Sequence, residues 1–326
     1  MSLKHFYPLL PGIIPLFFSC HQNPQEMLPG ITGKPGELVI VMKDKYWEGH
    51  TGEVFKGIFC AEVPALPQPE PMLDAVQIKP DAFADIFKTH RNIFILNISP
   101  NEKEKLEVKI DVWARPQIVI SLNVKDTIRA QQVLTAKGQK LLQYYLDKEK
   151  ERNITTFSMQ KNSVVVDKVQ KKFGIKLSIP RGYEIAREAD NFMWIRQEDK
   201  DKNLSLLIQM YDYKDKNTFS LDHLLDKRDE MTKAYVPGPS DGSYMQVFRD
   251  YPTHLEEVSL NGNYAAKLRG LWNVHGDFMG GPFVTYAMLN QTKDKVVMLD
   301  GFVFAPKLDK RNYIRQMDAI ISSVKF

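Results

Sequence analysis

The sequence contains a match to a known catalytic motif, G-x-S-x-G, at Gly238-Pro239-Ser240-Asp241-Gly242. In hydrolases with this motif the serine is a nucleophile, held on a sharp turn between a strand and a helix. Prolines stand on both sides of Gly238, and a proline interrupts the strand that would have to lead into Ser240. The segment is therefore more typical of a Pro/Gly loop that follows a helix beginning after Ser220.

A second group suited to acid–base chemistry is His275-Gly276-Asp277, which is followed by Gly280-Gly281-Pro282. A carboxylate near a histidine can orient the imidazole for proton transfer. The glycines favour the alternative that both side chains lie on a solvated hairpin turn. We keep His275 and Asp277 as candidate ligand-binding residues beside that alternative.

A third group combines cations with an aromatic ring. His90 and Arg91 stand at the start of an expected strand, and Trp113 and Arg115 stand at an expected hairpin tip. Such residues can grip an anion or stack on a planar ligand, so all four are candidate ligand-binding residues. The alternative is structural, with Arg91 paired to Glu70 and Trp113 packed in the core.

Motifs for metals and nucleotides are absent from the sequence. The histidines show neither H-x-x-x-H nor H-E-x-x-H spacing, and C-x-x-C, G-x-x-x-x-G-K and G-x-G-x-x-G do not occur. The net charge of +4 is small, whereas a nucleic-acid binder normally carries a concentrated basic face. We expect no metal, no cofactor, no nucleotide and no nucleic-acid partner.

The N-terminus indicates a compartment. Lys4 and His5 precede an apolar run from Phe6 to Phe18, which is too short to span a bilayer and is typical of a secretory signal. Ser19 followed by Cys20 resembles a bacterial lipobox, which implies cleavage before Cys20 and acylation of its thiol. Phe17 and Phe18 depart from the usual lipobox residues. The alternative is an apolar N-terminal segment docked on the protein.

If Cys20 is acylated, the only other cysteine is Cys60, and no disulfide within the chain is possible. Cys60 closes an apolar stretch that begins at Val54, so we expect a buried, inert thiol. Residues 1–19 are the predicted signal peptide. Residues 20–36 are rich in proline and glycine and are the predicted flexible tether.

The first expected domain covers residues 37–152. It begins with the apolar strand Glu37–Met42, continues with a hairpin that turns near Arg115-Pro116, and closes with a helix capped by Asp126. Residues 153–170 are polar and form the predicted linker.

The second expected domain covers residues 171–326. It opens with an alternating strand from Phe173 to Ile179, has a hairpin turn at Asn261-Gly262, and ends in a helix from about Asp309. The order of strands and helices predicts an α+β fold of two domains, each a mainly antiparallel sheet covered by helices.

The second half resembles a PsbP-like α/β/α sandwich, in Phe173–Pro180, the strand around Trp194, the strands Tyr264–Trp272 and Phe283–Phe304, and the closing residues 320–326. The whole chain resembles a Bacteroidetes lipoprotein family of unknown function. That likeness rests on the lipobox-like start, Leu66–Pro71, His90–Ile93 and Trp113–Gln117. It implies a location and no catalytic residues.

The predicted function is that of a lipid-anchored cell-envelope protein, non-enzymatic, which binds a ligand or an envelope partner protein. Its membrane contact is the N-terminal lipid anchor. No acidic run follows Cys20, which favours the periplasmic face of the outer membrane. The alternative is a periplasmic hydrolase whose site is scattered in sequence and uses His275, Asp277 or the pair Glu256-Glu257.

Overall fold

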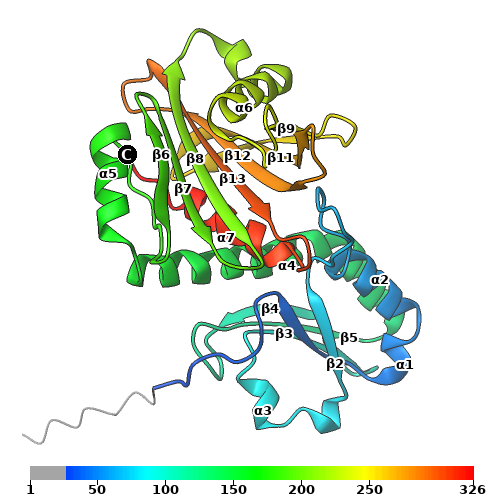
Figure 1. Cartoon of the computed structure of the whole chain (residues 1–326). Coiled ribbons are helices and arrows are strands. Elements are labelled where there is room, and N and C mark those ends of the chain that lie inside the picture. Colours follow the sequence, from blue (N-terminus) through cyan, green and yellow to red (C-terminus); the bar gives the residue numbers. More distant parts are fainter. Residues whose placement is uncertain (1–26) are drawn as a thin grey trace, which may run out of the picture.

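The computed structural model describes residues 27–326 and shows two sheets, each with its own helices (Figure 1). The predicted signal peptide, residues 1–19, and Cys20 lie outside the described residues. Among residues 27–326, no helix has both the length and the apolar character needed to cross a bilayer.

The first sheet has five strands in the order β2-β1-β3-β5-β4. Their bounds are β1 (Glu37–Val41), β2 (Asp74–Ile78), β3 (Asn92–Ile98), β4 (Lys105–Ile110) and β5 (Ile118–Val124). The β4–β5 hairpin is antiparallel, but β1 runs parallel to both of its neighbours and β3 runs parallel to β5. The prediction of a mainly antiparallel first sheet is therefore wrong. The central strands are buried on both faces, as is typical of parallel strands.

Helices cover one face of this sheet, and a short segment covers the other. The helices on the first face are α1 (Asp44–Trp47), α2 (His50–Phe59) and α4 (Thr127–Met159), and the short segment consists of a 3₁₀ turn at Pro80–Ala82 and α3 (Asp85–Lys88). Phe55 and Phe59 of α2 pack with Phe94 of β3 and Tyr145 of α4 in the core on the first face. The α3 segment covers the opposite face through Phe83 and Phe87.

One long helix, α4, reaches both sheets (Figure 1). Asp126 caps it as predicted, because its carboxylate accepts the backbone N–H of Arg129 at 2.7 Å. The helix has 33 residues and is about 50 Å long. It contains Gly138 where α2 approaches closely, since a Cβ there would lie 2.7 Å from Ile58.

The residues predicted as a polar linker, 153–170, are helical. Helix α4 continues to Met159, and α5 (Ser163–Phe173) follows after a short turn. The predicted strand from Phe173 to Ile179 is also wrong, because Phe173 ends α5 and the residues after it form only isolated bridges. Ile175, Leu177 and Ile179 are nevertheless buried. The alternating pattern therefore correctly indicated which side chains are buried, but not that the segment pairs as a strand.

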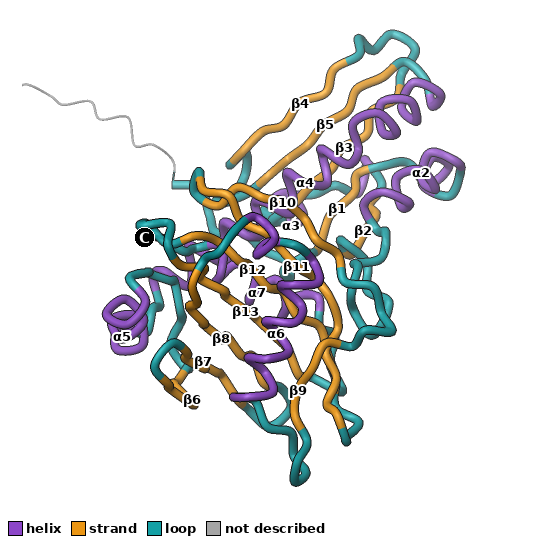
Figure 2. The backbone as a smooth tube through the Cα atoms, turned by 90° about the horizontal axis from the view of Figure 1, so that it is seen from above, coloured by secondary structure: helices purple, strands orange, loops and turns teal. Residues whose placement is uncertain are grey.

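The second sheet is antiparallel throughout, with strand order β10-β11-β12-β13-β8-β7-β6 and β9 paired to β11 (Figure 2). Its strands are β6 (Glu184–Ala189), β7 (Phe192–Glu198), β8 (Asn203–Asp212), β9 (Tyr244–Val247), β10 (His254–Leu260), β11 (Asn263–His275), β12 (Gly280–Leu289) and β13 (Lys295–Phe304). Asn261 and Gly262 both have positive φ and form the predicted turn between β10 and β11.

Helices lie on both faces of the second sheet, as in an α/β/α sandwich. Helix α6 (Leu221–Tyr235), preceded by the 3₁₀ turn Lys216–Phe219, packs on one core, and α5 and α7 (Arg311–Ser322) pack on the other. The predicted α+β class with two helix-covered sheets is confirmed. Under α6, the fully buried Arg228 and Asp300 form an ion pair at 2.8 Å.

The segment predicted as a tether is partly docked. Gly30 and Thr32 bridge Arg115 and His90, and the Arg115 N–H donates to the Pro29 carbonyl at 2.8 Å. Residues 29–36 therefore belong to the folded body. The prediction of a flexible tether is therefore wrong for these residues. They contain proline and glycine, but backbone hydrogen bonds to the first sheet hold them in place.

Candidate functional site

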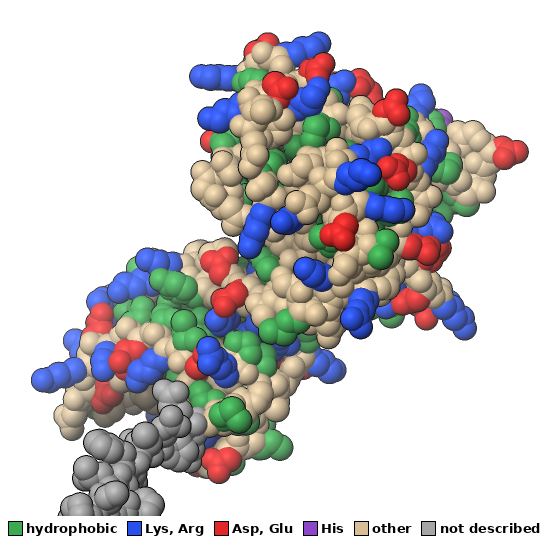
Figure 3. Space-filling model, turned by 90° about the vertical axis from the view of Figure 1, so that its left-hand side faces the viewer, with side chains coloured by type: hydrophobic (Ala, Val, Ile, Leu, Met, Phe, Trp, Pro, Cys, Tyr) green, Lys and Arg blue, Asp and Glu red, His purple; other side chains and the backbone are tan. Residues whose placement is uncertain are grey.

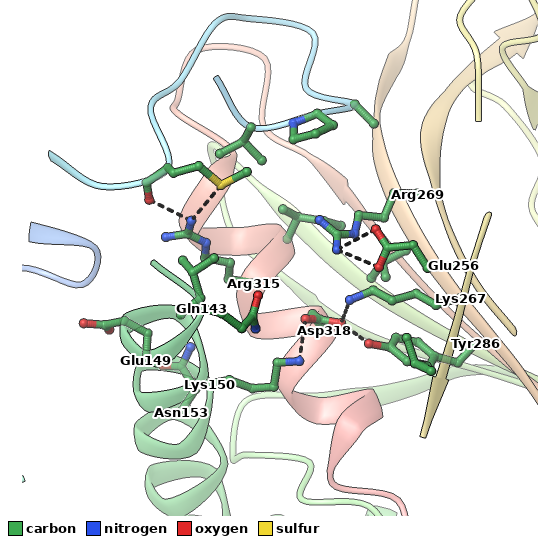
Figure 4. A pocket seen from close by; sticks show the side chains of 18 of the residues that line it. Gln143, Glu149, Lys150, Asn153, Glu256, Lys267, Arg269, Tyr286, Arg315 and Asp318 are labelled. Atoms are coloured by element: carbon green, nitrogen blue, oxygen red, sulfur yellow. Dashed lines mark hydrogen bonds and ion pairs between the residues drawn. The ribbon is translucent and has the colours of Figure 1, made fainter. Parts of the chain in front are cut away.

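A cleft of about 540 Å³ lies where the two sheets and their helices meet. Its walls come from α4, α7, the strands β10, β11 and β12, and the loop of residues 63–72 (Figure 4). Ligand sites typically have volumes of about 300–1,000 Å³ and often lie at domain interfaces. The cleft is thus of a size that holds a small molecule.

Four side chains form the floor of the cleft, and three of them converge on the carboxylate of the fourth (Figure 4). Asp318 of α7 lies 3.0 Å from the Lys267 ammonium of β11 and 3.3 Å from that of Lys150 of α4. The Tyr286 hydroxyl of β12 donates to the same carboxylate. Four elements of the fold, α4, α7, β11 and β12, therefore meet at one carboxylate.

These contacts perturb the protonation of the groups involved. Burial alone would raise the pKa of the Asp318 carboxyl, but Lys267, Lys150 and the Tyr286 hydroxyl hold it well below its ordinary value. Burial lowers the pKa of Lys267, although Asp318 opposes that shift. Lys267 is only 5% exposed, so its charge depends on this carboxylate.

Two guanidinium groups stand beside the floor. Arg269 of β11 donates through one nitrogen to both oxygens of Glu256 at 3.1 Å. Arg315 of α7 donates to the Met72 carbonyl at 2.8 Å, and burial lowers its pKa to about 10. Within residues 27–326 two buried guanidinium nitrogens, Nε of Arg269 and Nη1 of Arg315, have no hydrogen-bond partner.

The remaining walls of the cleft are mostly apolar. They include Leu142 and Leu146 of α4, Val258 and Leu260 of β10, and Ile314 of α7. The cleft thus combines a charged floor with apolar sides, which can hold a ligand that has both kinds of surface.

The structure places His90 and Arg91 in a buried network at the start of β3. The His90 ring lies 3.2 Å from Glu37, and Arg91 pairs with Glu149 of α4 at 3.0 Å. Glu149 also accepts from Arg152, whose pKa burial lowers to about 10. The partner expected for Arg91, Glu70, is not the one it has. Both side chains already have carboxylate partners.

Trp113 and Arg115 face different surroundings. Trp113 packs edge-on against Phe83 at 5.8 Å, whereas the exposed Arg115 side chain lies 3.3 Å from Asp111. Gln117 connects this group, since it accepts from the Trp113 N–H and donates to the His90 carbonyl. The fold brings these residues to one end of the sheet, and none of them lines the cleft described above.

His275 and Asp277 lie at the exposed turn between β11 and β12. The His275 ring stacks on Tyr244 at 5.0 Å, and within the described part of the chain no hydrogen bond joins it to Asp277. Asp277 instead accepts the Ser240 hydroxyl at 2.8 Å. Ser240 lies in a loop between α6 and β9, which confirms the loop interpretation of its motif.

The two glutamates that the sequence offered for a hydrolase lie on β10. Glu256 and Glu257 project to opposite faces of β10, where Glu256 contacts Arg269 and Glu257 contacts Tyr264.

Cys60 follows the last residue of α2 and lies half-buried against the first core, and burial raises the pKa of its thiol. Among residues 27–326 no group of three or more His, Cys, Asp or Glu side chains is arranged to hold a metal ion.

The charged floor of the cleft was not among the sites predicted from the sequence. Lys150, Lys267 and Asp318 are far apart in the chain and match no motif. One signal was available, because Lys267 and Arg269 alternate with Ala266 and Leu268 in an otherwise apolar strand. Two cations on one face of such a strand indicate a polar site beneath a helix.

The fold and the cleft define a two-part α+β protein with a charged site between its parts. The chain belongs to the family of the domain of unknown function DUF4837, whose model matches residues 161–323, half of the chain. A second domain of unknown function, DUF8532, matches residues 31–158. The two matches meet at the end of α4. A search of curated proteins finds no match.

Solved structures similar to this chain have low sequence identity. A mutant of protein Mog1 is 13% identical, with 46% of this chain and 89% of that chain covered and a TM-score of 0.31. The Ran-binding protein Mog1p of Saccharomyces cerevisiae is 13% identical, with 47% and 91% covered and a TM-score of 0.30. LpqN, involved in cell envelope biogenesis of Mycobacterium tuberculosis, is 14% identical, with 46% and 82% covered and a TM-score of 0.29.

Proposed function

We propose that this chain is a non-enzymatic binding protein of the bacterial cell envelope, and that its ligand occupies the cleft between the two sheets. The observation that carries this proposal is the cleft of about 540 Å³ with the buried Lys267 in its floor. Burying an ammonium group costs free energy unless an anion pairs with it, and that anion can come from the protein or from a ligand.

Binding is favoured over catalysis by the partners of the charged groups. Asp318 is shared by Lys150, Lys267 and Tyr286, so it is held ionised and is poorly suited to act as a base. Among the described residues no hydrogen bond joins the Ser259 side chain, which lines the cleft, to a base, and burial raises the pKa of the Tyr286 hydroxyl well above its usual value. The groups hold a fixed pattern of charge, which suits recognition.

The envelope location rests on the N-terminal sequence. We propose that the chain is cut before Cys20 and anchored by acylation of that thiol, in the periplasm-facing leaflet of the outer membrane. Each buried methylene of an acyl chain adds about 0.8 kcal/mol of membrane affinity. On the face shown in Figure 3, Lys and Arg side chains are interspersed with Asp and Glu, a pattern that supports the expectation of no nucleic-acid partner.

Labelling with palmitate tests the anchor. We expect label on the wild-type chain and none on Cys20→Ser, with Cys60→Ser as the matched control that keeps the label. An unlabelled wild-type chain would overturn the anchor. Cross-linking in intact cells would identify the envelope partner protein that we expect beside the ligand.

Native mass spectrometry tests the cleft. The protein purified from its own cells should carry a bound small molecule, and substitution of Leu146 by Arg should remove it by filling the cleft. The matched control Tyr144→Arg alters an exposed position on the same helix and should leave the molecule bound. If the protein carries no molecule under any condition, the proposed binding function is wrong.

The second candidate is a hydrolase, and one contact favours it. The Ser240 hydroxyl donates to Asp277 at 2.8 Å on an exposed loop, so a serine and a carboxylate do meet there. The imidazole that would have to activate the serine, His275, is stacked on Tyr244. Binding therefore remains the better-supported function.

A further inference from the structure

We propose that the ligand of the cleft is an amphiphile with a single anionic head group, a carboxylate or a phosphate, and an apolar tail. This inference rests on the proposed binding function and names the class of ligand. The floor of the cleft recognises the head, and the apolar walls cover the tail.

The charges that face the cleft favour an anion. Four cations line it, on α4, β11 and α7: Lys150, Lys267, Arg269 and Arg315. Three carboxylates line it as well, but Glu149 is already bound by Arg91 and Arg152, which lie outside the lining. Only Asp318 and Glu256 are left to balance four positive charges. The cleft therefore carries an excess of positive charge.

Donors without acceptors point to the position of the head group. Arg269 uses one terminal nitrogen, Nη2, for Glu256, and within residues 27–326 its buried Nε has no hydrogen-bond partner. Arg315 has a buried terminal nitrogen with no acceptor among the same residues. A guanidinium has donors only, so the group that completes these sites must be an acceptor. A carboxylate or phosphate oxygen is the strongest such group.

The apolar walls account for the rest of the ligand. Leu142 and Leu146 of α4, Leu260 of β10 and Ile314 of α7 border the same cleft as the cations. A purely polar anion would leave these side chains facing water, whereas an attached apolar tail would cover them. Burial contributes about 25 cal/mol for each Å² of apolar surface.

The remaining carboxylates limit the charge of the ligand. Asp318 and Glu256 stay in the cleft and would repel a second anionic group on the same ligand. A neutral amphiphile would leave the guanidinium donors without a charged acceptor. A single anionic head group is the case that satisfies both conditions.

Calorimetric titration of the full chain carrying Cys20→Ser tests this inference, since that variant has no thiol at position 20 to acylate. Four dodecyl compounds differ only in the head group: dodecanoate, dodecyl phosphate, dodecanol and dodecyltrimethylammonium. Each is used below its micelle concentration or, for dodecanol, below its solubility limit. We expect the two anions to bind and the other two not to bind. The tighter of the two anions identifies the head group, and inorganic phosphate alone should bind much more weakly.

Two variants with opposite expected effects locate the head group. Arg269→Gln should weaken binding of both anions by about 10- to 100-fold, the usual worth of a charge-assisted hydrogen bond. Glu256→Gln should tighten binding, because it removes the carboxylate that competes for Arg269; a merely structural role of Glu256 predicts no tightening. The matched control Arg249→Gln alters a surface arginine that is paired with Asp226 and Asp229, and it should change nothing.

The outcomes separate this inference from the proposed function. Equal binding of dodecanol and dodecanoate, or equal binding of phosphate and dodecyl phosphate, would overturn the anionic amphiphile. Failure of all four dodecyl compounds would also overturn it. If native mass spectrometry still finds a bound molecule in that case, the binding function stands with a ligand of another class.

Discussion

Glu70 accepts the backbone N–H of Arg311 at 2.9 Å, and so joins the loop of the first sheet to the first turn of α7 in the second. The same carboxylate accepts the N–H of Lys310, and it is 5% exposed. A carboxylate at this position satisfies N–H groups that have no partner within the helix and complements the helix dipole. One side chain therefore caps a helix that belongs to the other half of the molecule.

Replacing Glu70 by Gln should destabilise the protein by about 2 kcal/mol, because it removes the charge and one of the two acceptors. Urea denaturation would measure the loss as a lower midpoint. Glu62→Gln, an exposed carboxylate in the same loop, is the matched control and should leave the midpoint unchanged. An unchanged midpoint for Glu70→Gln would show that the cap contributes nothing.

Asp318 should make stability depend on pH. Its pKa in the folded state lies below that of the unfolded chain, which is about 3.9 for an aspartate. The stabilisation is therefore complete above about pH 4 and is lost as the pH falls toward the folded-state pKa. Asp318→Asn should cost about 3–5 kcal/mol at pH 7, because it leaves Lys267 buried without a carboxylate.

The measurement is the difference in unfolding free energy between wild type and Asp318→Asn, taken from pH 7 down to pH 2. We expect the difference to shrink below pH 4. Asp190→Asn, at an exposed position, is the control and should show no difference at any pH. A difference that stays constant with pH would refute the role assigned to the Asp318 charge.

The buried pair Arg228–Asp300 should show strong coupling. Asp300→Asn should cost about 3–5 kcal/mol, because the guanidinium would remain in the core without a counter-charge. In a double-mutant cycle with Arg228→Met, the loss of unfolding free energy in the double variant should be smaller than the sum of the losses in the two single variants. Additive losses would mean that the pair acts only through packing.

A fluorophosphonate probe should not label Ser240. Its hydroxyl donates to Asp277, and the imidazole that a serine hydrolase would need, His275, is stacked on Tyr244. Mass spectrometry of the treated protein would detect an adduct at the serine, with Ser240→Ala as the blank. An adduct on Ser240 would favour the hydrolase.

The fold was partly predictable from local pattern. The Asp126 cap and the Asn261-Gly262 turn depend on neighbouring residues alone, and both appear where the sequence indicates. The end of α4 was not predictable, because Asn153 to Thr156 are weak helix formers. The helix continues there because Phe157 packs on the second core, so tertiary contact overrides local preference.

The site was less predictable than the fold. Lys150 and Asp318 meet only because α4 passes α7, and that packing depends on contacts between distant parts of the chain. Arg91 illustrates the same limit, since its partner is Glu149 on α4 and not Glu70, which is closer to it in the sequence. Residue type indicated that Arg91 needs a carboxylate but did not say which one.

The docked segment 29–36 determines how the body would sit above a membrane. If Cys20 carries the lipid, only residues 21–28 separate it from Pro29, which is held by Arg115. Eight residues reach at most about 28 Å when fully extended. The half of the molecule that contains the first sheet would therefore lie next to the bilayer, with the second sheet pointing away from it. A ligand leaving the membrane would have to cross only about the height of that first half to reach the cleft.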